Sequence, residues 1–136
     1  MITSVDTNVL LDIFSASPRF GAPSREALRA CSREGRLVAS EVVWAEVSAA
    51  FASPRAANEA LASLGVDFVP MTSGAALKAG TAWRTYRKRG GGRRNRVIPD
   101  FLIGAHALDA SDRLLTRDRG FYRSSFRRLR VLDPAA

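Results

Sequence analysis

The fold expected for this chain follows from one stretch near its start, Ile2-Thr3-Ser4-Val5-Asp6-Thr7-Asn8-Val9-Leu10-Leu11-Asp12. A short β-branched run ends in an aspartate, and a helical spacing of apolar residues begins directly after it. A carboxylate at a strand-to-helix switch lies at the carboxyl edge of a parallel sheet, where open α/β folds bind their ligands. We therefore expect further acidic residues at equivalent positions later in the chain.

Strand-like and helix-like segments alternate along the rest of the chain. Short apolar runs predict further strands at residues 37–39, 66–69, 113–116 and 129–132. Helical spacing predicts helices at about residues 8–14, 24–33, 41–52, 54–64 and 73–89, and from Pro99 onward. The 73–89 helix is expected to bury Ala76, Leu77, Gly80, Trp83 and Tyr86. This alternation predicts one α/β domain over residues 1–136, with a mostly parallel sheet of four to five short strands between helices.

Composition and cysteine content exclude several classes of protein. The chain has 136 residues, of which 46% are hydrophobic and 25% charged, as in ordinary globular proteins. No apolar run approaches the ~20 residues that span a bilayer, and Asp6 and Asp12 interrupt any N-terminal signal peptide. Cys31 is the only cysteine and is expected to be a packing residue. Together these features predict a cytoplasmic protein without a membrane segment.

The net charge of +8 is unevenly distributed along the chain. Residues 84–136 carry fourteen basic and five acidic residues, whereas residues 1–83 carry seven and eight. A basic surface on one side of a protein suits a polyanion, most simply nucleic acid. A coding bias toward arginine, with a role in solubility, is the alternative explanation.

Four acidic residues occupy positions that a parallel sheet directs to its carboxyl edge. Asp6 ends the first predicted strand, Asp118 follows the fourth, and Asp100 begins a helix. Glu46 lies in the 41–52 helix, whose apolar residues on nearly every side predict burial. A buried carboxylate needs a metal, a cleft or an arginine partner, and the sequence leaves these alternatives open for Glu46. Gly104, one turn after Asp100, is expected to keep space clear beside that carboxylate.

Acidic residues that share one edge point to a metal site. Their charges repel one another unless a cation neutralises them. Hard oxygen ligands without cysteine or histidine select Mg²⁺ or Mn²⁺. Such an ion lowers the pKa of a bound water and stabilises the leaving oxygen in phosphoryl chemistry. Combined with a basic surface, the acids predict a metal-dependent nuclease.

Other catalytic chemistries find less support in the residues. His106 is the only histidine, so a Ser–His–Asp triad or a histidine-rich zinc site is disfavoured, and His106 is expected to be a packing or surface residue. Gly90-Gly91-Gly92 is not followed by Gly-Lys-Ser or Gly-Lys-Thr, which excludes a P-loop. An aspartate-nucleophile phosphatase needs a second acid two residues after the first, and Asn8 stands there.

Four blocks of the sequence carry a resemblance to a known family. They are Asp6–Asp12 (DTNVLLD), Ser40–Val47 (SEVVWAEV), Pro99–Ala107 (PDFLIGAHA) and Leu115–Tyr122 (LTRDRGFY). In order and spacing they resemble the PIN-domain ribonucleases, and most of all the VapC-type toxins of bacterial toxin–antitoxin pairs. The resemblance covers essentially the whole chain, and its specificity lies in the four blocks together.

The resemblance implies a PIN-like three-layer sandwich and a Mg²⁺- or Mn²⁺-dependent endoribonuclease that acts on structured RNA. The site residues that it implies are the main metal ligands Asp6 and Asp100, the further acids Glu46 and Asp118, and the supporting polar residues Asn8 and Thr116. It also implies a homodimer that is held inactive by a cognate antitoxin protein.

The basic residues near these blocks are the expected RNA contacts. They are Arg89, Arg93, Arg94, Arg96, Arg117 and Arg119. The glycine-rich basic loop over residues 89–96 is not a hallmark of the family, so it is either an RNA contact or a connector. Asp12 is expected on the helix surface or just behind the site. The alternative function is a catalytically inactive nucleic-acid-binding module with the same fold.

Overall fold

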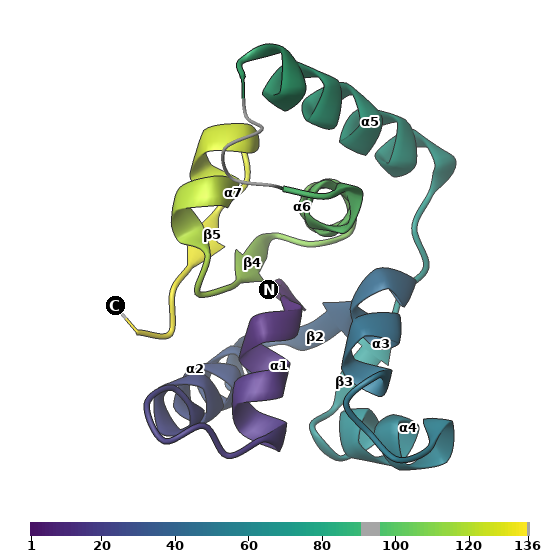
Figure 1. The fold of residues 1–136 in the computed structure, drawn as a ribbon. Coiled ribbons are helices and arrows are strands. Elements are labelled where there is room, and N and C mark those ends of the chain that lie inside the picture. The colour runs from purple at the N-terminus through teal and green to yellow at the C-terminus, as the bar shows by residue number, and fades with distance from the viewer. Residues whose placement is uncertain (91–95, 136) are drawn as a thin grey trace.

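The structure is a computed structural model that describes residues 1–90 and 96–135, and within them five strands form one sheet (Figure 1). The strands are β1 (Ile2–Val5), β2 (Arg36–Ala39), β3 (Val66–Phe68), β4 (Arg113–Leu115) and β5 (Val131–Leu132). The helices are α1 (Thr7–Phe14), α2 (Gly21–Glu34), α3 (Glu41–Ser48), α4 (Pro54–Ser63), α5 (Ser73–Lys88), α6 (Ile98–Ala110) and α7 (Arg119–Ser125).

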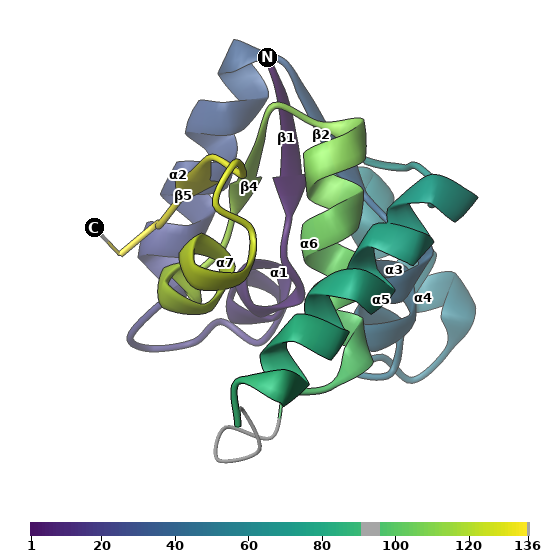
Figure 2. The ribbon, with the colours of Figure 1, turned by 90° about the horizontal axis from the view of Figure 1, so that it is seen from above.

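Every strand pairing in this sheet is parallel, and the strand order is β3-β2-β1-β4-β5. Ser4 of the central strand β1 lies opposite Val38 of β2 on one side and Leu114 of β4 on the other. Helices α6 and α7 lie on one face of the sheet, with α5 packed on the outer side of α6, and α1 and α2 lie on the opposite face (Figures 1 and 2). The predicted α/β arrangement of a parallel sheet between layers of helices is confirmed.

The strand order reverses at β1. The chain first builds β2 and β3 on one side of β1, and then crosses over to build β4 and β5 on the other side. In open α/β sheets the crevice at such a switch point, at the carboxyl ends of the strands, binds ligands. Asp6 directly follows β1, and residues 116–118 directly follow β4. The topology therefore brings these two segments, distant in the sequence, to one edge of the sheet.

Side chains at the starts of several helices accept hydrogen bonds from free backbone N–H groups, as helix caps do. Asp6 is the N-cap of α1, and its carboxylate accepts a 2.7 Å hydrogen bond from the backbone N–H of Thr7. Ser40 caps α3 and Thr72 caps α5 in the same way. The carboxylate at the end of β1 is thus held by the first turn of the following helix.

The buried core surrounds the two central strands. Val5 of β1 and Leu114 of β4 are fully buried, together with Leu10 of α1 and Phe101 of α6. Burial of each such side chain stabilises the fold by about 1.5–3 kcal/mol. The predicted packing role of Cys31 is confirmed, since it is also buried in this core. No helix of the described residues has the length and hydropathy to cross a membrane.

The prediction that the helix containing Glu46 is buried on all sides is wrong. Helix α3 ends at Ser48, and only Val43 and Val47 within it are buried. It packs against α1, α4 and α6 along one side. Its small residues on the other side face solvent, and Glu46 is exposed among them. An apolar composition made largely of alanine and valine did not require burial here.

Helix α5 buries a different face from the predicted one. Ala75 and Ala79 are its fully buried residues, and Trp83 and Tyr86 pack against the core in part. Leu77, predicted to be buried, is 75% exposed. The helix packs on α6 through these alanines and through Tyr86, whose ring contacts Phe101. The predicted face is therefore wrong in the first half of the helix and correct at Trp83 and Tyr86.

Candidate active site

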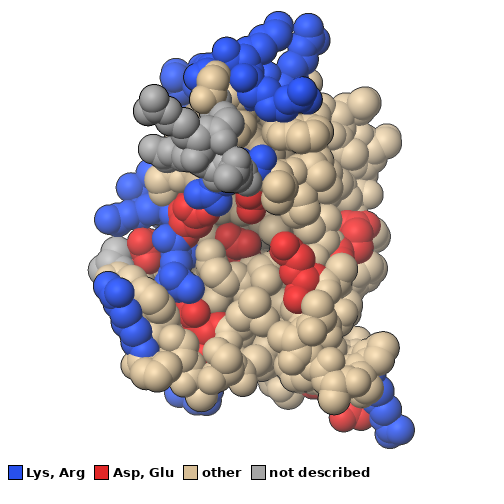
Figure 3. Space-filling view, viewed as in Figure 1, with Lys and Arg blue, Asp and Glu red and all other residues tan. Residues whose placement is uncertain are grey.

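The candidate site lies at the carboxyl edge of the sheet, which faces the viewer in Figures 1 and 3. Acidic side chains gather near the middle of this face, and lysine and arginine side chains lie above and to the left of them (Figure 3). Asp6, at the end of β1, is the most buried of the four predicted acids, with a relative exposure of 5%.

The carboxylate of Asp6 is fixed by hydrogen bonds on both of its oxygens. Oδ1 accepts from the backbone N–H of Thr7, and Oδ2 accepts from the Thr116 hydroxyl at 2.7 Å. Burial raises the pKa of Asp6 to about 6, although these hydrogen bonds favour its charged form. A carboxylate that is held rigidly and is short of neutralising charge is suited to receive a cation.

Asn8 and Thr116 lie beside Asp6, as predicted for supporting residues. The Asn8 amide nitrogen is 3.4 Å from both Asp6 Oδ2 and Thr116 Oγ1, and Asn8 Oδ1 accepts from the backbone N–H of Arg117 at 3.2 Å. Thr116 Oγ1 also accepts from the backbone N–H of Asp118. These two side chains therefore connect the start of α1 to the turn that carries Asp118.

Glu46 approaches the site from α3 but is not buried. Its Oε1 accepts a 2.7 Å hydrogen bond from the Thr7 hydroxyl, and its charge contributes to the raised pKa of Asp6. Of the alternatives left open for Glu46, burial against an arginine is excluded, because its side chain is exposed and its hydrogen-bond partner is a threonine.

Asp100 of α6 and Asp118, which precedes α7, both face Arg96. The Arg96 guanidinium makes two hydrogen bonds to Asp118, at 2.5 and 3.1 Å, and its Nη1 is 3.9 Å from Asp100 Oδ2. Burial raises the pKa of Asp100, and the charge of Arg96 opposes that rise. Arg96, predicted to contact RNA, thus already pairs with the acids of the site.

Tyr122 lies at the site, although the sequence alone did not single it out as a site residue. It is almost fully buried in α7, and its hydroxyl is close enough to Asp6 for each group to shift the pKa of the other. Burial raises the pKa of its phenol, and the charges of Asp6, Asp100 and Asp118 raise it further. One phenol is therefore within electrostatic reach of three of the four predicted acids. The position of Tyr122, four residues after Asp118, was the only signal for this role.

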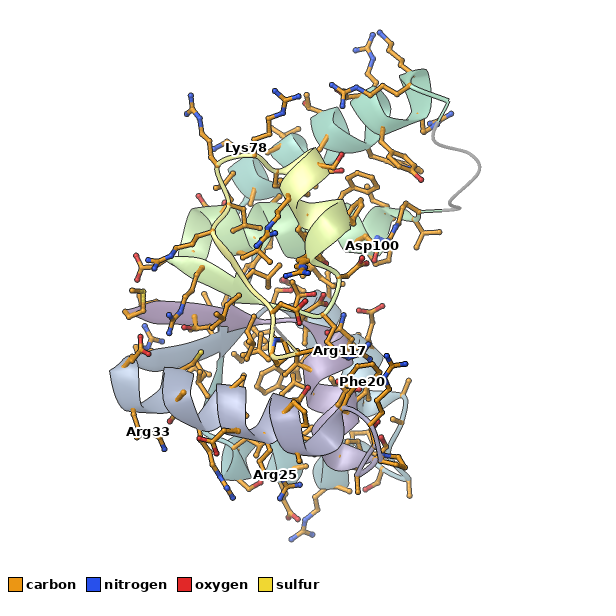
Figure 4. The ribbon with its side chains drawn as sticks, turned by 90° about the vertical axis from the view of Figure 1, so that its left-hand side faces the viewer. Phe20, Arg25, Arg33, Lys78, Asp100 and Arg117 are labelled. Atoms are coloured by element: carbon orange, nitrogen blue, oxygen red, sulfur yellow. The ribbon has the colours of Figure 1, made fainter. Side chains whose placement is uncertain are left out.

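Arg117, another predicted RNA contact, is bound within the protein. Its Nε and Nη2 donate to Asp12 at 2.7 and 3.0 Å, and its guanidinium lies 3.9 Å from the centre of the Phe20 ring (Figure 4). Asp12 is buried and also accepts from Ser24. Asp12 was expected either on the helix surface or just behind the site. The first expectation is wrong, because Asp12 is buried, and its contact with Arg117 agrees with the second.

Of the four remaining arginines predicted to contact RNA, the structure describes two. Arg89 and Arg119 are exposed, and Arg119 pairs with Asp133 at 3.4 Å. Arg93 and Arg94 lie outside the described residues. Contact with RNA stays a prediction for all of them.

Gly104 and His106 have structural explanations. A Cβ atom on Gly104 would lie 2.4 Å from Cε2 of Phe126, so this glycine makes room for an aromatic ring and not for a molecule approaching Asp100. His106 is buried, with Nε2 2.7 Å from the carbonyl oxygen of Val69, which confirms its predicted packing role.

Comparison with known proteins identifies the family to which this chain belongs. The PIN domain family matches residues 4–127. The chain belongs to the PIN domain family. No curated protein matches it in sequence.

Solved structures share the fold of this PIN domain. A chain of VapBC-1 from nontypeable Haemophilus influenzae matches with a TM-score of 0.75 and 21% identity, over 100% of both chains. A chain of VapBC2 from Rickettsia felis, solved bound to a DNA fragment from their promoter, matches with a TM-score of 0.73 and 17% identity, over 98% of each chain. A toxin–antitoxin complex from Klebsiella pneumoniae matches with a TM-score of 0.70 and 22% identity, over 97% of each chain. Identities this low show a shared fold.

The acids of this PIN domain fit a divalent cation in their chemistry. The carboxylate of Asp6 is fully desolvated and that of Asp100 partly so. Carboxylate oxygens are ligands that Mg²⁺ and Mn²⁺ prefer. Within residues 1–90 and 96–135, however, no three His, Cys, Asp or Glu side chains are grouped as metal ligands. Glu46 bonds to Thr7 and Asp118 bonds to Arg96. Of the four acids, Asp118 alone is held by a two-pronged pair with a cationic side chain among the described residues.

Proposed function

We propose that this PIN domain is a Mg²⁺- or Mn²⁺-dependent endoribonuclease and the toxin of a toxin–antitoxin pair. The observation that best supports the proposal is the gathering of three acids at the switch point of the sheet, where Thr116 bonds to both Asp6 and the backbone of Asp118, and Arg96 contacts both Asp118 and Asp100. A fold requires no such gathering of negative charge, since like charges close together destabilise one another. A cation that binds there relieves the repulsion.

The residues around the site have distinct proposed roles. Asp6 and Asp100 hold the cation, which when bound lowers the pKa of a water molecule and stabilises the oxygen that leaves. Thr116 and Asn8 keep Asp6 in one orientation through their hydrogen bonds. Glu46, exposed beside Thr7, is placed to accept a proton at the solvent side of the site.

The basic side chains beside the acids support a nucleic-acid substrate. Lysine and arginine side chains flank the acidic centre on the face shown in Figure 3. They neutralise backbone phosphates and release bound counterions, so affinity is expected to fall steeply as salt rises. The exposed Arg89 and Arg119 are the described candidates for these contacts.

The antitoxin and the homodimer are part of the same proposal. The solved relatives include VapBC assemblies and a complex named as toxin–antitoxin. Co-expression with the product of the neighbouring gene, followed by copurification, tests the antitoxin. Sedimentation of the isolated chain over a range of concentrations tests the homodimer.

Cleavage of labelled structured RNA tests the activity. We expect cleavage with Mg²⁺ or Mn²⁺, loss of cleavage in EDTA, and loss in Asp6→Asn and Asp100→Asn variants whose circular dichroism matches the parent. Glu59→Gln is the matched control, because Glu59 is an exposed acid of α4 whose partner among the described residues is Arg55. If both site variants cleave as well as this control, the site assignment is wrong.

The same experiment distinguishes the alternative of an inactive nucleic-acid-binding module. Such a module binds RNA equally well in Mg²⁺ and in EDTA and produces no cleavage fragments. Expression of the parent should arrest growth, and expression of the Asp100→Asn variant should not. Growth arrest that is equal for both proteins contradicts a catalytic toxin.

A further inference from the structure

We propose that Arg96 is a built-in cation of the acidic site, which occupies Asp118 in place of a second metal ion and leaves Asp6 and Asp100 to bind one divalent ion. The inference rests on the proposed function, because it concerns the same metal site. It assigns to Arg96 a role that differs from the predicted contact with RNA.

The first observation is the two-pronged contact between Arg96 and Asp118. Nη1 donates to Oδ2 at 2.5 Å and Nη2 donates to Oδ1 at 3.1 Å, so both carboxylate oxygens of Asp118 are engaged. Paired N–H groups of this kind match the shape of a carboxylate and form one of the stronger ion pairs in proteins. A metal ion that coordinates Asp118 has to use the remaining lone pairs of these oxygens, close to the positive charge of the guanidinium, which disfavours its binding.

The second observation is the position of the guanidinium between two acids. Nη1, which bonds to Asp118, also lies 3.9 Å from Asp100 Oδ2. The guanidinium thus supplies one positive charge to both carboxylates, which reduces the repulsion that a second cation would otherwise relieve. The side chain of Arg96 is only 24% exposed, so solvent screens this interaction weakly.

The third observation is that the guanidinium rests on a buried aromatic ring. Its Cζ lies 4.5 Å from the centre of Phe121, which is itself buried and packs edge-on against Phe101 of α6. Arginine stacks favourably on aromatic faces, and the contact restricts the rotamers of Arg96. Arg96 also lies two residues before α6, so its backbone is anchored close to Asp100.

Charge balance supports a single metal ion. Asp6, Glu46, Asp100 and Asp118 carry four negative charges when ionised. One divalent ion together with Arg96 supplies three positive charges and keeps every contact of the guanidinium. Two divalent ions balance the four acids only when Arg96 has left the site.

Manganese binding by the full chain tests this proposal. Calorimetry and Mn²⁺ electron paramagnetic resonance measure the affinity and the number of ions bound, with no reference to cleavage. We expect the parent to bind one Mn²⁺ ion. Arg96→Gln should bind a second ion or bind Mn²⁺ roughly tenfold more tightly, the scale on which residues bonded to metal ligands alter affinity. Arg55→Gln, which removes an exposed arginine of α4 outside the site, should bind as the parent does.

A second substitution separates this role from a general loss of charge. Asp118→Asn should leave Mn²⁺ affinity within about twofold of the parent, since Asp118 is not a ligand while Arg96 holds it. In the Arg96→Gln background the same change should abolish the gained binding. Arg96→Lys keeps the positive charge but cannot form the two-pronged contact with Asp118. Its Mn²⁺ affinity should therefore lie between those of the parent and Arg96→Gln.

The outcomes separate this inference from the proposed function. Two Mn²⁺ ions in the parent, or identical Mn²⁺ binding by the parent and Arg96→Gln, overturns the role of Arg96 and leaves a metal-dependent nuclease standing. The absence of Mn²⁺ binding by every variant overturns both. A lower RNA affinity of Arg96→Gln with unchanged Mn²⁺ binding returns Arg96 to the predicted contact with RNA.

Discussion

The Thr116 hydroxyl donates a 2.7 Å hydrogen bond to Oδ2 of Asp6, which joins residues that are 110 positions apart in the chain. The bond connects the end of β4 to the end of β1, on the two sides of the switch point. Thr116 is fully buried and also accepts from the backbone N–H of Asp118. One threonine therefore sets the position of two of the predicted acids.

Removal of that hydroxyl should make Asp6 harder to ionise. Thr116→Val keeps the shape of the side chain but removes a hydrogen bond to a buried carboxylate. We expect the pKa of Asp6 to rise above its value of about 6 and the free energy of unfolding to fall by about 1–3 kcal/mol. Carboxyl-carbon NMR titration and urea unfolding measure the two effects. Thr81→Val, which removes an exposed hydroxyl of α5, is the control and should change neither quantity.

Asp6 should destabilise the metal-free protein above pH 6. Burial raises its pKa from 3.8 to about 6, so the folded state binds the proton more tightly than the unfolded chain does. The contribution of Asp6 to the free energy of unfolding therefore falls as the pH rises from about 4 to 6. In EDTA at pH 8, Asp6→Asn should be about 1–3 kcal/mol more stable than the parent, and the difference should shrink at pH 4.

Thermal unfolding followed by circular dichroism measures this effect. Mg²⁺ should raise the melting temperature of the parent at pH 8 and leave that of Asp6→Asn unchanged, because the ion binds the folded state of the parent alone. Glu59→Gln should respond to Mg²⁺ as the parent does. An Asp6→Asn variant that is less stable than the parent at both pH values contradicts the raised pKa.

Arg117 should matter for stability more than for RNA binding. Arg117→Gln leaves Asp12 buried without its charged partner, so we expect a loss of about 2–4 kcal/mol in the free energy of unfolding. Arg55→Gln breaks the exposed pair with Glu59 and should lose about 0–0.5 kcal/mol. Chemical unfolding of both variants tests the contrast. A stable Arg117→Gln protein with reduced RNA affinity supports instead the predicted contact with RNA.

Two glycines within helices should respond oppositely to alanine. Gly104→Ala places a Cβ atom 2.4 Å from the Phe126 ring, which we expect to destabilise the protein by about 1–3 kcal/mol. Gly80→Ala in α5 meets no atom within 4 Å and should stabilise it by up to about 1 kcal/mol. Urea unfolding compares the two variants. Addition of Phe126→Leu should recover part of the loss caused by Gly104→Ala, and a loss that stays the same contradicts the steric explanation.

Local patterns in the sequence were enough to predict the class of fold. Short apolar runs and helical spacings predicted all five strands, the parallel sheet and the positions of α1 to α6, because such patterns depend on neighbours a few residues apart. Helix α7 was not predicted, since its seven residues are too few for a clear period. The strand-end positions of Asp6 and Asp118 followed from the same local signals.

The contacts that define the site depend on which strands are adjacent. That β1 lies between β2 and β4 is decided by the packing of helices on the two faces, and it brings Thr116 to Asp6. The tertiary structure also turned Glu46 to solvent, paired Arg96 with Asp118, and placed Tyr122 beside the acids. A side chain bonds to the partner that the fold brings within about 3 Å. The sequence alone therefore determined which residues carry the charge, and only the tertiary structure decided which charges meet.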